Sequence, residues 1–358
     1  MNKVWVILFH LFWLTHPGLV TAADLSHHPF SQAYALFDEG KFTEAAPRFR
    51  EALDQKDALE DYSLYFLGVI AFTGDSNEEA RGYFSRLKKG FPRSVWLSDA
   101  TFHLARIELR EGKPQETIQL LKALDSKSVG EPLHTESLFL LGQTYQDQKD
   151  PKQAHAAYQR LRANYPLTPW AGKAKEEVQS LRAKFPELLV PKDPDSLTKE
   201  ADILLGELDF AAAEKIFLNF PGRKTDKKLR FSYLTGLAEV YRWARRRVRE
   251  KEILKEIVRE YPQTSEASDA FYRIAEIQWN QGKNQEALKR FKQLQERYPQ
   301  NSNVDHAEFA RGRIFESLKV PSEAIKVYSG FAKKFPRSRW RVEAAWRLAW
   351  IHYLAGDY

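Results

Sequence analysis

The densest group of side chains that could bind a ligand lies between residues 242 and 249. This stretch holds five arginines and one tryptophan, in the order Arg242, Trp243, Ala244, Arg245, Arg246, Arg247, Val248 and Arg249. Guanidinium groups form paired hydrogen bonds with carboxylates and phosphates, and they stack on planar rings. The cluster could therefore bind an anionic polymer or a planar ligand. The alternative is a solvated turn, or a turn whose arginines pair with acids such as Glu250 and Glu252.

Signatures of catalysis are absent from the sequence. It contains no Gly-x-x-x-x-Gly-Lys-Ser/Thr, Gly-x-Gly-x-x-Gly, Gly-x-Ser-x-Gly or His-Glu-x-x-His motif. It has no cysteine, which excludes disulfide scaffolds, zinc fingers, thiol enzymes and iron–sulfur clusters. The adjacent His27 and His28 do not complete a tetrahedral site, and the carboxylates alternate with Lys and Arg as on a solvated surface. We expect no catalytic residue, no metal site and no cofactor.

A pattern of about 37 residues recurs along the chain. Its most regular copy has a turn at Gly282, a small residue at Ala287, an aromatic residue at Phe291 and the pair Tyr298-Pro299. The small position, here called the ruler residue, falls at Ala45, Ala80, Thr117, Ala154, Ala213, Glu250, Ala287 and Ala324. The spacings are 35, 37, 37, 59, 37, 37 and 37 residues. A fixed period in this range is typical of solenoid proteins.

Each repeat predicts two antiparallel helices. Phe271, Ile274 and Gln278 follow helical spacing, and the second half of the repeat does the same. The proline that ends most repeats cannot continue a helix, because it lacks the amide hydrogen and clashes with the preceding turn. No stretch alternates as a half-buried strand does. We predict an all-α superhelix of about eight hairpins that ends within a hairpin, with an extra helix near residues 168–185 that accounts for the spacing of 59.

The amino-terminal segment is typical of a secretory signal peptide. Lys3 precedes the apolar stretch Val4–Leu14, and Val20-Thr21-Ala22 forms a small-residue cleavage pattern. The apolar stretch is shorter than the roughly 20 residues that a membrane-spanning helix needs. We therefore assign residues 1–22 to a cleaved signal peptide and expect a periplasmic protein without a transmembrane anchor.

The remaining chain divides into two blocks. Residues 23–186 hold four hairpins and the extra helix, and residues 197–358 hold the later hairpins. Three prolines fall between Pro186 and Pro194, and they interrupt the helical pattern. We predict a proline-rich linker over residues 187–196.

The repeats resemble the tetratricopeptide repeat family. The copies that match its pattern best contain Leu64, Leu67, Gly68, Ala80, Phe84, Leu87 and Pro92, and Leu138, Leu141, Gly142, Tyr145, Ala154, Tyr158, Leu161 and Pro166. The resemblance implies that the first helix of each hairpin lines a concave groove. Side chains on that face either fill the core or bind an extended peptide or glycan. The candidates are Arg106, Phe139, Gln143, Tyr272, Trp279, Arg313 and Trp346.

The last segment, residues 340–358, predicts a first helix without a second. Helix arrays need a polar terminal face, but this segment is rich in Trp346, Trp350 and other apolar residues. We expect its aromatic face to contact a downstream domain or a partner, or to form a dimer. The sequence of residues 335–358 is similar to that of the helical superhelix that precedes the catalytic domain of soluble lytic murein transglycosylases. It resembles envelope assembly proteins of the same repeat type more weakly.

Two functions are compatible with these features. The first is an exported, non-catalytic scaffold that binds envelope proteins or peptidoglycan. The alternative, implied by the second resemblance, is the amino-terminal arm of a peptidoglycan lytic transglycosylase whose catalytic domain lies downstream of residue 358. The net charge of +7 favours anionic partners or simply keeps the protein soluble, and nucleic acid is not expected as a partner.

Overall fold

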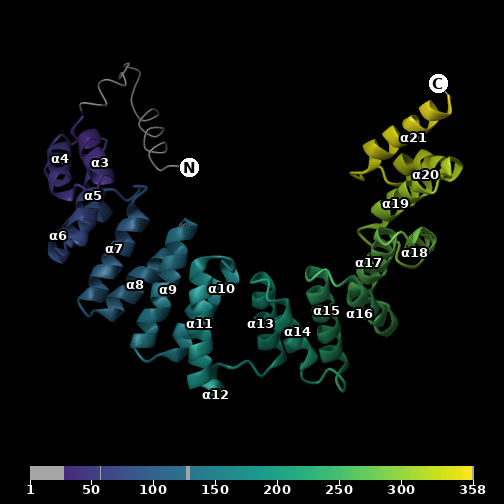
Figure 1. The fold of residues 1–358 in the computed structure, drawn as a ribbon, viewed down its shortest axis with the longest axis horizontal. Coiled ribbons are helices and arrows are strands. Elements are labelled where there is room, and N and C mark those ends of the chain that lie inside the picture. Colours follow the sequence, from purple (N-terminus) through teal and green to yellow (C-terminus); the bar gives the residue numbers. More distant parts are fainter. Residues whose placement is uncertain (1–27, 57, 126–129, 357–358) are drawn as a thin grey trace. The chain divides into compact units, whose positions relative to one another are not determined.

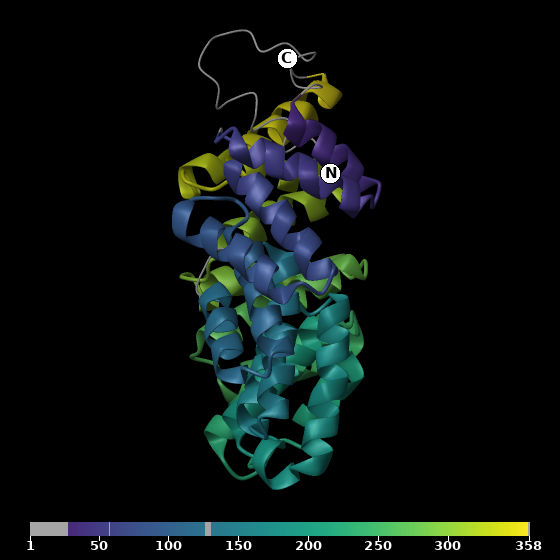
Figure 2. The ribbon, with the colours of Figure 1, turned by 90° about the vertical axis from the view of Figure 1, so that its left-hand side faces the viewer.

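The computed structural model describes residues 28–56, 58–125 and 130–356. All regular structure in this part of the chain is helical, as the coiled ribbons of both views show (Figure 1; Figure 2). The predicted all-α fold is confirmed. The signal peptide predicted at residues 1–22 lies outside the described residues.

The helices are α3 (Pro29–Asp38), α4 (Phe42–Asp54), α5 (Glu60–Thr73), α6 (Asn77–Gly90), α7 (Leu97–Arg110), α8 (Pro114–Asp125), α9 (Glu131–Asp147), α10 (Pro151–Asn164), α11 (Pro169–Lys184), α12 (Pro186–Leu189), α13 (Pro194–Gly206), α14 (Phe210–Leu218), α15 (Lys227–Trp243), α16 (Arg247–Glu260), α17 (Ser265–Asn280), α18 (Asn284–Arg297), α19 (Val304–Ser317), α20 (Pro321–Lys334) and α21 (Arg341–Ala355).

Consecutive helices pair as hairpins, from α3 with α4 to α9 with α10, and from α13 with α14 to α19 with α20. Every ruler residue lies on the second helix of its hairpin, and all eight expose 1% of their surface or less. A small side chain at this position lets the helices approach closely. The repeat is therefore a packing requirement as well as a sequence pattern.

A second small residue recurs on the first helices, and where it is glycine it lies against an aromatic ring of the second helix. A Cβ atom added at Gly68 would lie 2.5 Å from the ring of Phe84. A Cβ atom added at Gly142 would lie 2.3 Å from the ring of Tyr158. The equivalent positions, here called the small-residue positions, are Ala33, Gly68, Ala105, Gly142, Ala201, Ala238, Ala275, Gly312 and Ala349. All of them are buried except Ala349 in α21. At these glycines the ring of the second helix thus fills the space that the missing side chain leaves, whereas Leu121 and Leu254 stand at the ring position in the third and sixth hairpins.

The turn inside each hairpin has one backbone conformation throughout. A residue with positive φ stands five positions before each ruler residue, as at Gly282 (φ 73°) and Arg245 (φ 54°). The amide of the next residue donates back to the helix, as Lys283 does to the Gln278 carbonyl at 2.9 Å. This arrangement is the Schellman motif, which satisfies carbonyls at a helix end. The residues concerned are Gly40, Asp75, Gly112, Lys149, Leu208, Arg245, Gly282 and Lys319, and Gly356 ends α21 in the same conformation.

The chain forms two compact units that divide after Val190. Unit 1 includes α11, which follows the fourth hairpin and buries Ala174, Val178 and Leu181 against it. The linker predicted over residues 187–196 is shorter in the structure, because α12 begins at Pro186 and α13 begins at Pro194. Proline is well tolerated at the first position of a helix, where its missing amide hydrogen would have no partner. The prolines therefore start helices here, and only residues 190–193 connect them.

The outer face of α21 is apolar and exposed. Trp346 and Trp350 stack with their ring centroids 5.7 Å apart, and Trp350 stacks on Tyr353 at 5.4 Å. Trp346 exposes 57% of its surface and Trp350 exposes 44%. Since Ala349 is also exposed, this face is the one that carries a second helix in every other hairpin.

Candidate functional site

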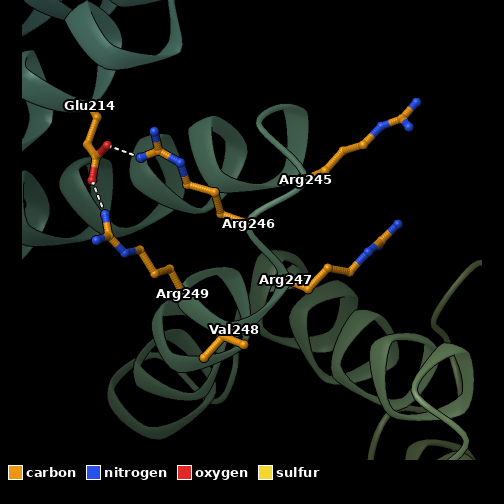
Figure 3. A pocket seen from close by; sticks show the side chains of 6 residues that line it. All are labelled: Glu214, Arg245, Arg246, Arg247, Val248 and Arg249. Atoms are coloured by element: carbon orange, nitrogen blue, oxygen red, sulfur yellow. Dashed lines mark hydrogen bonds and ion pairs between the residues drawn. The ribbon is translucent and has the colours of Figure 1, made fainter.

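The arginine cluster forms the turn between α15 and α16, as predicted from the ruler. Glu214 of α14 accepts from Arg246 and from Arg249, the latter at 2.8 Å (Figure 3). Burial opposes ionisation of Glu214, but hydrogen bonds from Tyr241 and Arg246 outweigh it and lower the pKa of this carboxyl group. Two of the five arginines therefore have a structural role, in which they join the turn to the preceding hairpin.

The acid that pairs with the cluster differs from the ones that the sequence suggested. Glu250 pairs with Arg273 at 2.7 Å, and Glu252 pairs with Lys255 at 2.9 Å. Arg242 lies 3.6 Å from Glu239, whose carboxylate also accepts from the Trp243 indole at 2.6 Å. Glu250 and Glu252, which the sequence suggested as examples of acids that could pair with the cluster, therefore pair with other cations, and Glu214 pairs with the cluster.

Arg245 and Arg247 extend away from Glu214, both to the same side (Figure 3). Among the described residues, neither forms an ion pair with a carboxylate. An open cleft of about 790 Å³ lies beside them, lined by Glu214 and residues 245–249. These two guanidinium groups can bind an anionic group without breaking a contact of the described fold.

Unit 2 has a polar groove of about 570 Å³ along its first helices. It is lined by Thr235, Ala238, Glu239, Arg242, Glu250, Leu254, Ile257, Glu266, Asp269, Ala270, Tyr272, Arg273, Glu276, Ser302, Asn303, His306 and Arg339. Five of these residues are carboxylates and three are arginines. The groove combines donors and acceptors of both charges, as a binding surface for a polar, extended partner would.

An ion-pair network forms part of this groove. Glu250, which exposes 1% of its side chain, pairs with Arg273, and Arg273 also contacts Glu276. The Tyr272 hydroxyl and the His306 ring form a hydrogen bond. Burial is the main reason that the pKa of His306 is lowered and that the pKa of Tyr272 is raised. These groups hold one another in place, so the network gives the groove a fixed shape.

Unit 1 has a second groove, of about 670 Å³, where α7, α9 and α11 begin. Its lining is more apolar, with Val95, Leu133 and Trp170, and it carries the carboxylates of Asp99, Glu131 and Glu136. Trp170 packs on Phe139 with ring centroids 5.0 Å apart. The two grooves therefore differ in chemistry.

Three of the predicted groove residues lie in unit 1, and the structure places them differently. Gln143 is exposed on α9. Arg106 is half-buried, with its guanidinium 4.8 Å from the ring centre of Phe72. Phe139 exposes only 7% of its surface and packs against Tyr158 and Trp170, so it belongs to the core.

The predicted residues of unit 2 also divide between core and surface. Tyr272 lines the unit 2 groove but exposes only 9% of its surface. Trp279 is half-buried, with its ring 6.4 Å from that of Phe291. Arg313 lies 3.7 Å from Glu343 of α21. Trp346 and Trp350 are exposed on α21 and do not line the groove.

Sequence reasoning missed several groove residues, including Glu250, His306 and Arg339. A signal for Glu250 was present, since a charged residue occupies the ruler position that Ala or Thr occupies in every other repeat. His306 and Arg339 come from different hairpins, and their proximity depends on how the hairpins stack.

Two negative findings concern only the described part of the chain. No group of three His, Asp or Glu side chains is placed there to hold a metal ion. Within the same residues, no helix has the length and the apolar run needed to cross a bilayer.

Sequence models of the tetratricopeptide repeat match three stretches of the chain. One match covers residues 30–95, and another model of the same repeat matches residues 136–168 and 269–301. These stretches include the first two hairpins, the fourth hairpin, and the α17–α18 hairpin beside the unit 2 groove. A search of curated proteins finds no match.

Solved structures with a similar chain course include several repeat proteins. A tetratricopeptide repeat protein from Parabacteroides merdae is 16% identical, with a TM-score of 0.36 over 83% of this chain and 99% of that one. The pilF protein of Pseudomonas aeruginosa is 15% identical, with a TM-score of 0.33 over 69% and 96% of the two chains. The TPR2AB domain of yeast Sti1, solved as a complex with pHSP90, is 13% identical, with a TM-score of 0.31 over 75% and 99%.

Proposed function

We propose that this chain, which carries tetratricopeptide repeats, is an exported, non-catalytic scaffold of the bacterial envelope. The repeats imply protein partners, and the segment at residues 1–22 supports export to the periplasm. In this role the protein binds an envelope protein or a peptidoglycan strand along its first helices.

The unit 2 groove is the observation that carries this proposal. Its volume of about 570 Å³ and its lining from α15, α16, α17 and the start of α19 suit a segment of an extended partner. The Glu250–Arg273–Glu276 network is already formed, so binding would cost little side-chain ordering. Charged groups of both signs would then fix the direction and register of the partner.

Site-specific photocrosslinking tests the groove. A photoreactive phenylalanine is placed at Glu276 in the groove, and at Lys289, an exposed residue of α18 outside the groove, as a matched control. We expect the position 276 variant to crosslink one discrete envelope component, which mass spectrometry assigns to a protein or to peptidoglycan. Equal crosslinking from both positions, or none from position 276, would contradict the proposal.

The absence of catalysis is tested separately. The purified chain is incubated with peptidoglycan sacculi, and the release of soluble fragments is followed by chromatography. We expect no release above a heat-treated control, because the scaffold proposal assigns no acid and nucleophile pair to this chain. Measurable turnover by the chain alone would overturn the scaffold proposal even if the groove binds a partner.

A second candidate is the helical arm of a peptidoglycan lytic transglycosylase. It rests on the resemblance of residues 335–358 and on the exposed face of α21. Gly356 has the left-handed conformation of the hairpin turns, and Ala349 is the one small-residue position left uncovered. In this proposal a further helix, followed by a catalytic domain, would cover Trp346 and Trp350.

The intact mass of the natural gene product distinguishes the two candidates. A mass slightly below 41.6 kDa, after signal cleavage, supports the scaffold whose aromatic face meets a partner or a second copy. A substantially larger mass supports the arm and directs the search to the additional domain.

A further inference from the structure

The turns of unit 2 line one edge of its helix array. Each of the turns at Leu208, Arg245, Gly282 and Lys319 joins the end of a first helix to the start of its second helix, so the four turns occupy the same place in successive hairpins. Contacts between neighbouring hairpins support this, because Glu214 at the start of α14 holds Arg246 and Arg249 of the next turn. We call these turns and their flanking residues the turn edge.

Exposed apolar side chains gather on the turn edge. Leu208 exposes 54% of its surface, Trp243 58%, Val248 68% and Val320 37%. Apart from the face of α21, Leu218 is the only other large apolar residue of the described part of unit 2 that is exposed to this degree. The solvent-facing apolar surface of these hairpins is therefore concentrated at their turns.

Unit 1 does not share this feature. Its exposed large apolar residues, within the described part, lie after second helices or near the end of the unit: Val95, Leu167, Phe185, Leu188 and Val190. At its hairpin turns, the left-handed positions carry glycine, aspartate or lysine. The apolar turns are thus specific to unit 2 and are not required by the repeat.

Cationic side chains accompany the apolar ones on the turn edge. They are Arg242, Arg245, Arg247, Lys283 and Lys319. In the structure as described, only Arg242 of this set has an ion pair, a long one of 3.6 Å to Glu239. Two acids flank Leu208, of which Asp209 caps α14 by accepting from the Ala212 amide at 3.2 Å. The cations therefore outnumber the acids along this edge.

This combination matches the chemistry of a bilayer surface. Tryptophan prefers the headgroup level of a membrane, where its ring is partly buried and its N–H is hydrated. Arginine extends its charged end to phosphate groups while its aliphatic stem covers apolar surface. Each cation close to an anionic leaflet strengthens binding by about 1 kcal/mol, which is about fivefold. A soluble protein partner would leave the alternation of cations and small apolar tips without an evident reason.

We propose that the turn edge of unit 2 binds the surface of a bilayer that contains anionic lipids. Trp243, Val248 and Leu208 insert among the headgroups, and Arg245 and Arg247 contact lipid phosphates. The groove proposed above is a separate surface, lined by other residues except Arg242. The membrane proposal does not depend on it, and either one can fail alone.

Vesicle co-sedimentation tests the proposal. The chain is produced without residues 1–22, which include none of the described residues and whose apolar stretch would itself bind lipid. Vesicles contain phosphatidylcholine with or without phosphatidylglycerol. We expect binding only to the anionic vesicles, and weaker binding as the salt concentration rises.

Two variants separate charge from insertion. We expect Arg245→Gln with Arg247→Gln to weaken binding roughly 30-fold, the product of two lost cations. We expect Trp243→Ser with Val248→Ser to weaken it on the order of tenfold. Neither pair should alter helical circular dichroism, because Arg245 and Arg247 have no described ion pair and the other two are exposed.

The matched control is Lys289→Gln with Lys292→Gln, which removes the same charge from the exposed face of α18. It should leave binding within about twofold of the unchanged chain, given that electrostatic attraction falls off within a Debye length. Equal loss in the control would refute the proposal in favour of net charge alone. Binding to neutral vesicles, or no binding at all, would also refute it. Displacement by inorganic phosphate or by soluble polyphosphate would assign the edge to a free anion.

Discussion

The buried ion pair between Glu250 and Arg273 gives the sharpest test of how unit 2 is held together. Glu250→Ala removes a carboxylate that exposes 1% of its side chain and leaves Arg273, 21% exposed, with Glu276 as its remaining acid. Breaking a fully buried pair costs about 3–5 kcal/mol. Because Arg273 reaches solvent and keeps one partner, we expect a loss of about 2–3 kcal/mol in the free energy of unfolding.

Urea unfolding followed by circular dichroism measures this loss. The free energy of unfolding falls with urea concentration by about 2 kcal/mol per M. The midpoint of the unfolding transition of unit 2 should therefore move to a urea concentration about 1–1.5 M lower. The control is Glu252→Ala, two residues away, where the exposed pair with Lys255 should contribute less than about 0.5 kcal/mol. A midpoint for Glu250→Ala equal to that of Glu252→Ala would refute the assigned role of the pair.

A double variant identifies the physical cause. Combining Glu250→Ala with Arg273→Leu removes both charges and gives the repeat the small ruler residue that the others have. Replacement of a buried pair by apolar residues is often neutral, so stability should return to within about 1 kcal/mol of the unchanged chain. If the double variant stays as unstable as the single one, the loss comes from a cavity and not from an unpaired charge.

Three further predictions use the same measurements. Gly142→Ala should lower stability by about 1–3 kcal/mol, because its Cβ would lie 2.3 Å from a tyrosine ring, whereas Gly172→Ala, with nothing within 4 Å, should be neutral or stabilising. Gly282→Ala should cost about 1 kcal/mol through its φ of 73° alone, and no loss would argue against the left-handed turn. Burial lowers the pKa of His103 to about 4, with two arginines adding to the effect. Below about pH 6.5 the unfolded chain therefore binds a proton at His103 that the folded chain does not bind, so stability should fall between about pH 6.5 and 4. His103→Phe should remove this contribution and make the fall smaller.

The sequence predicted the hairpins and their turns, because these features depend on residues that are close together in the chain. The ruler located all eight hairpins, since its position is buried in every one of them and is occupied by a small residue in all but the hairpin of Glu250. It also located the turn at Arg245, because the distance from turn to ruler residue is five in every repeat. Local spacing was less informative about linkers, where Pro186 and Pro194 start helices instead of breaking them.

The candidate sites were harder to predict because they depend on contacts between hairpins. Glu214 lies more than 30 residues from Arg246 and Arg249, and no local pattern links them. Phe139 and Tyr272 share a helical face with groove residues, yet neighbouring aromatic rings and helices bury them. A one-dimensional pattern gives the face of a helix but not how much of that face its neighbours cover.

The constant distance between turn and ruler residue indicates which parts of this chain should tolerate an inserted domain. That distance is five residues in all eight hairpins, whereas the separation from one ruler residue to the next turn ranges from 30 to 54. The length differences between repeats therefore lie outside the segment that joins the turn to the ruler residue. A reporter domain inserted into residues 190–193 should leave both units intact, and the same insertion at Gly282 should separate α17 from α18.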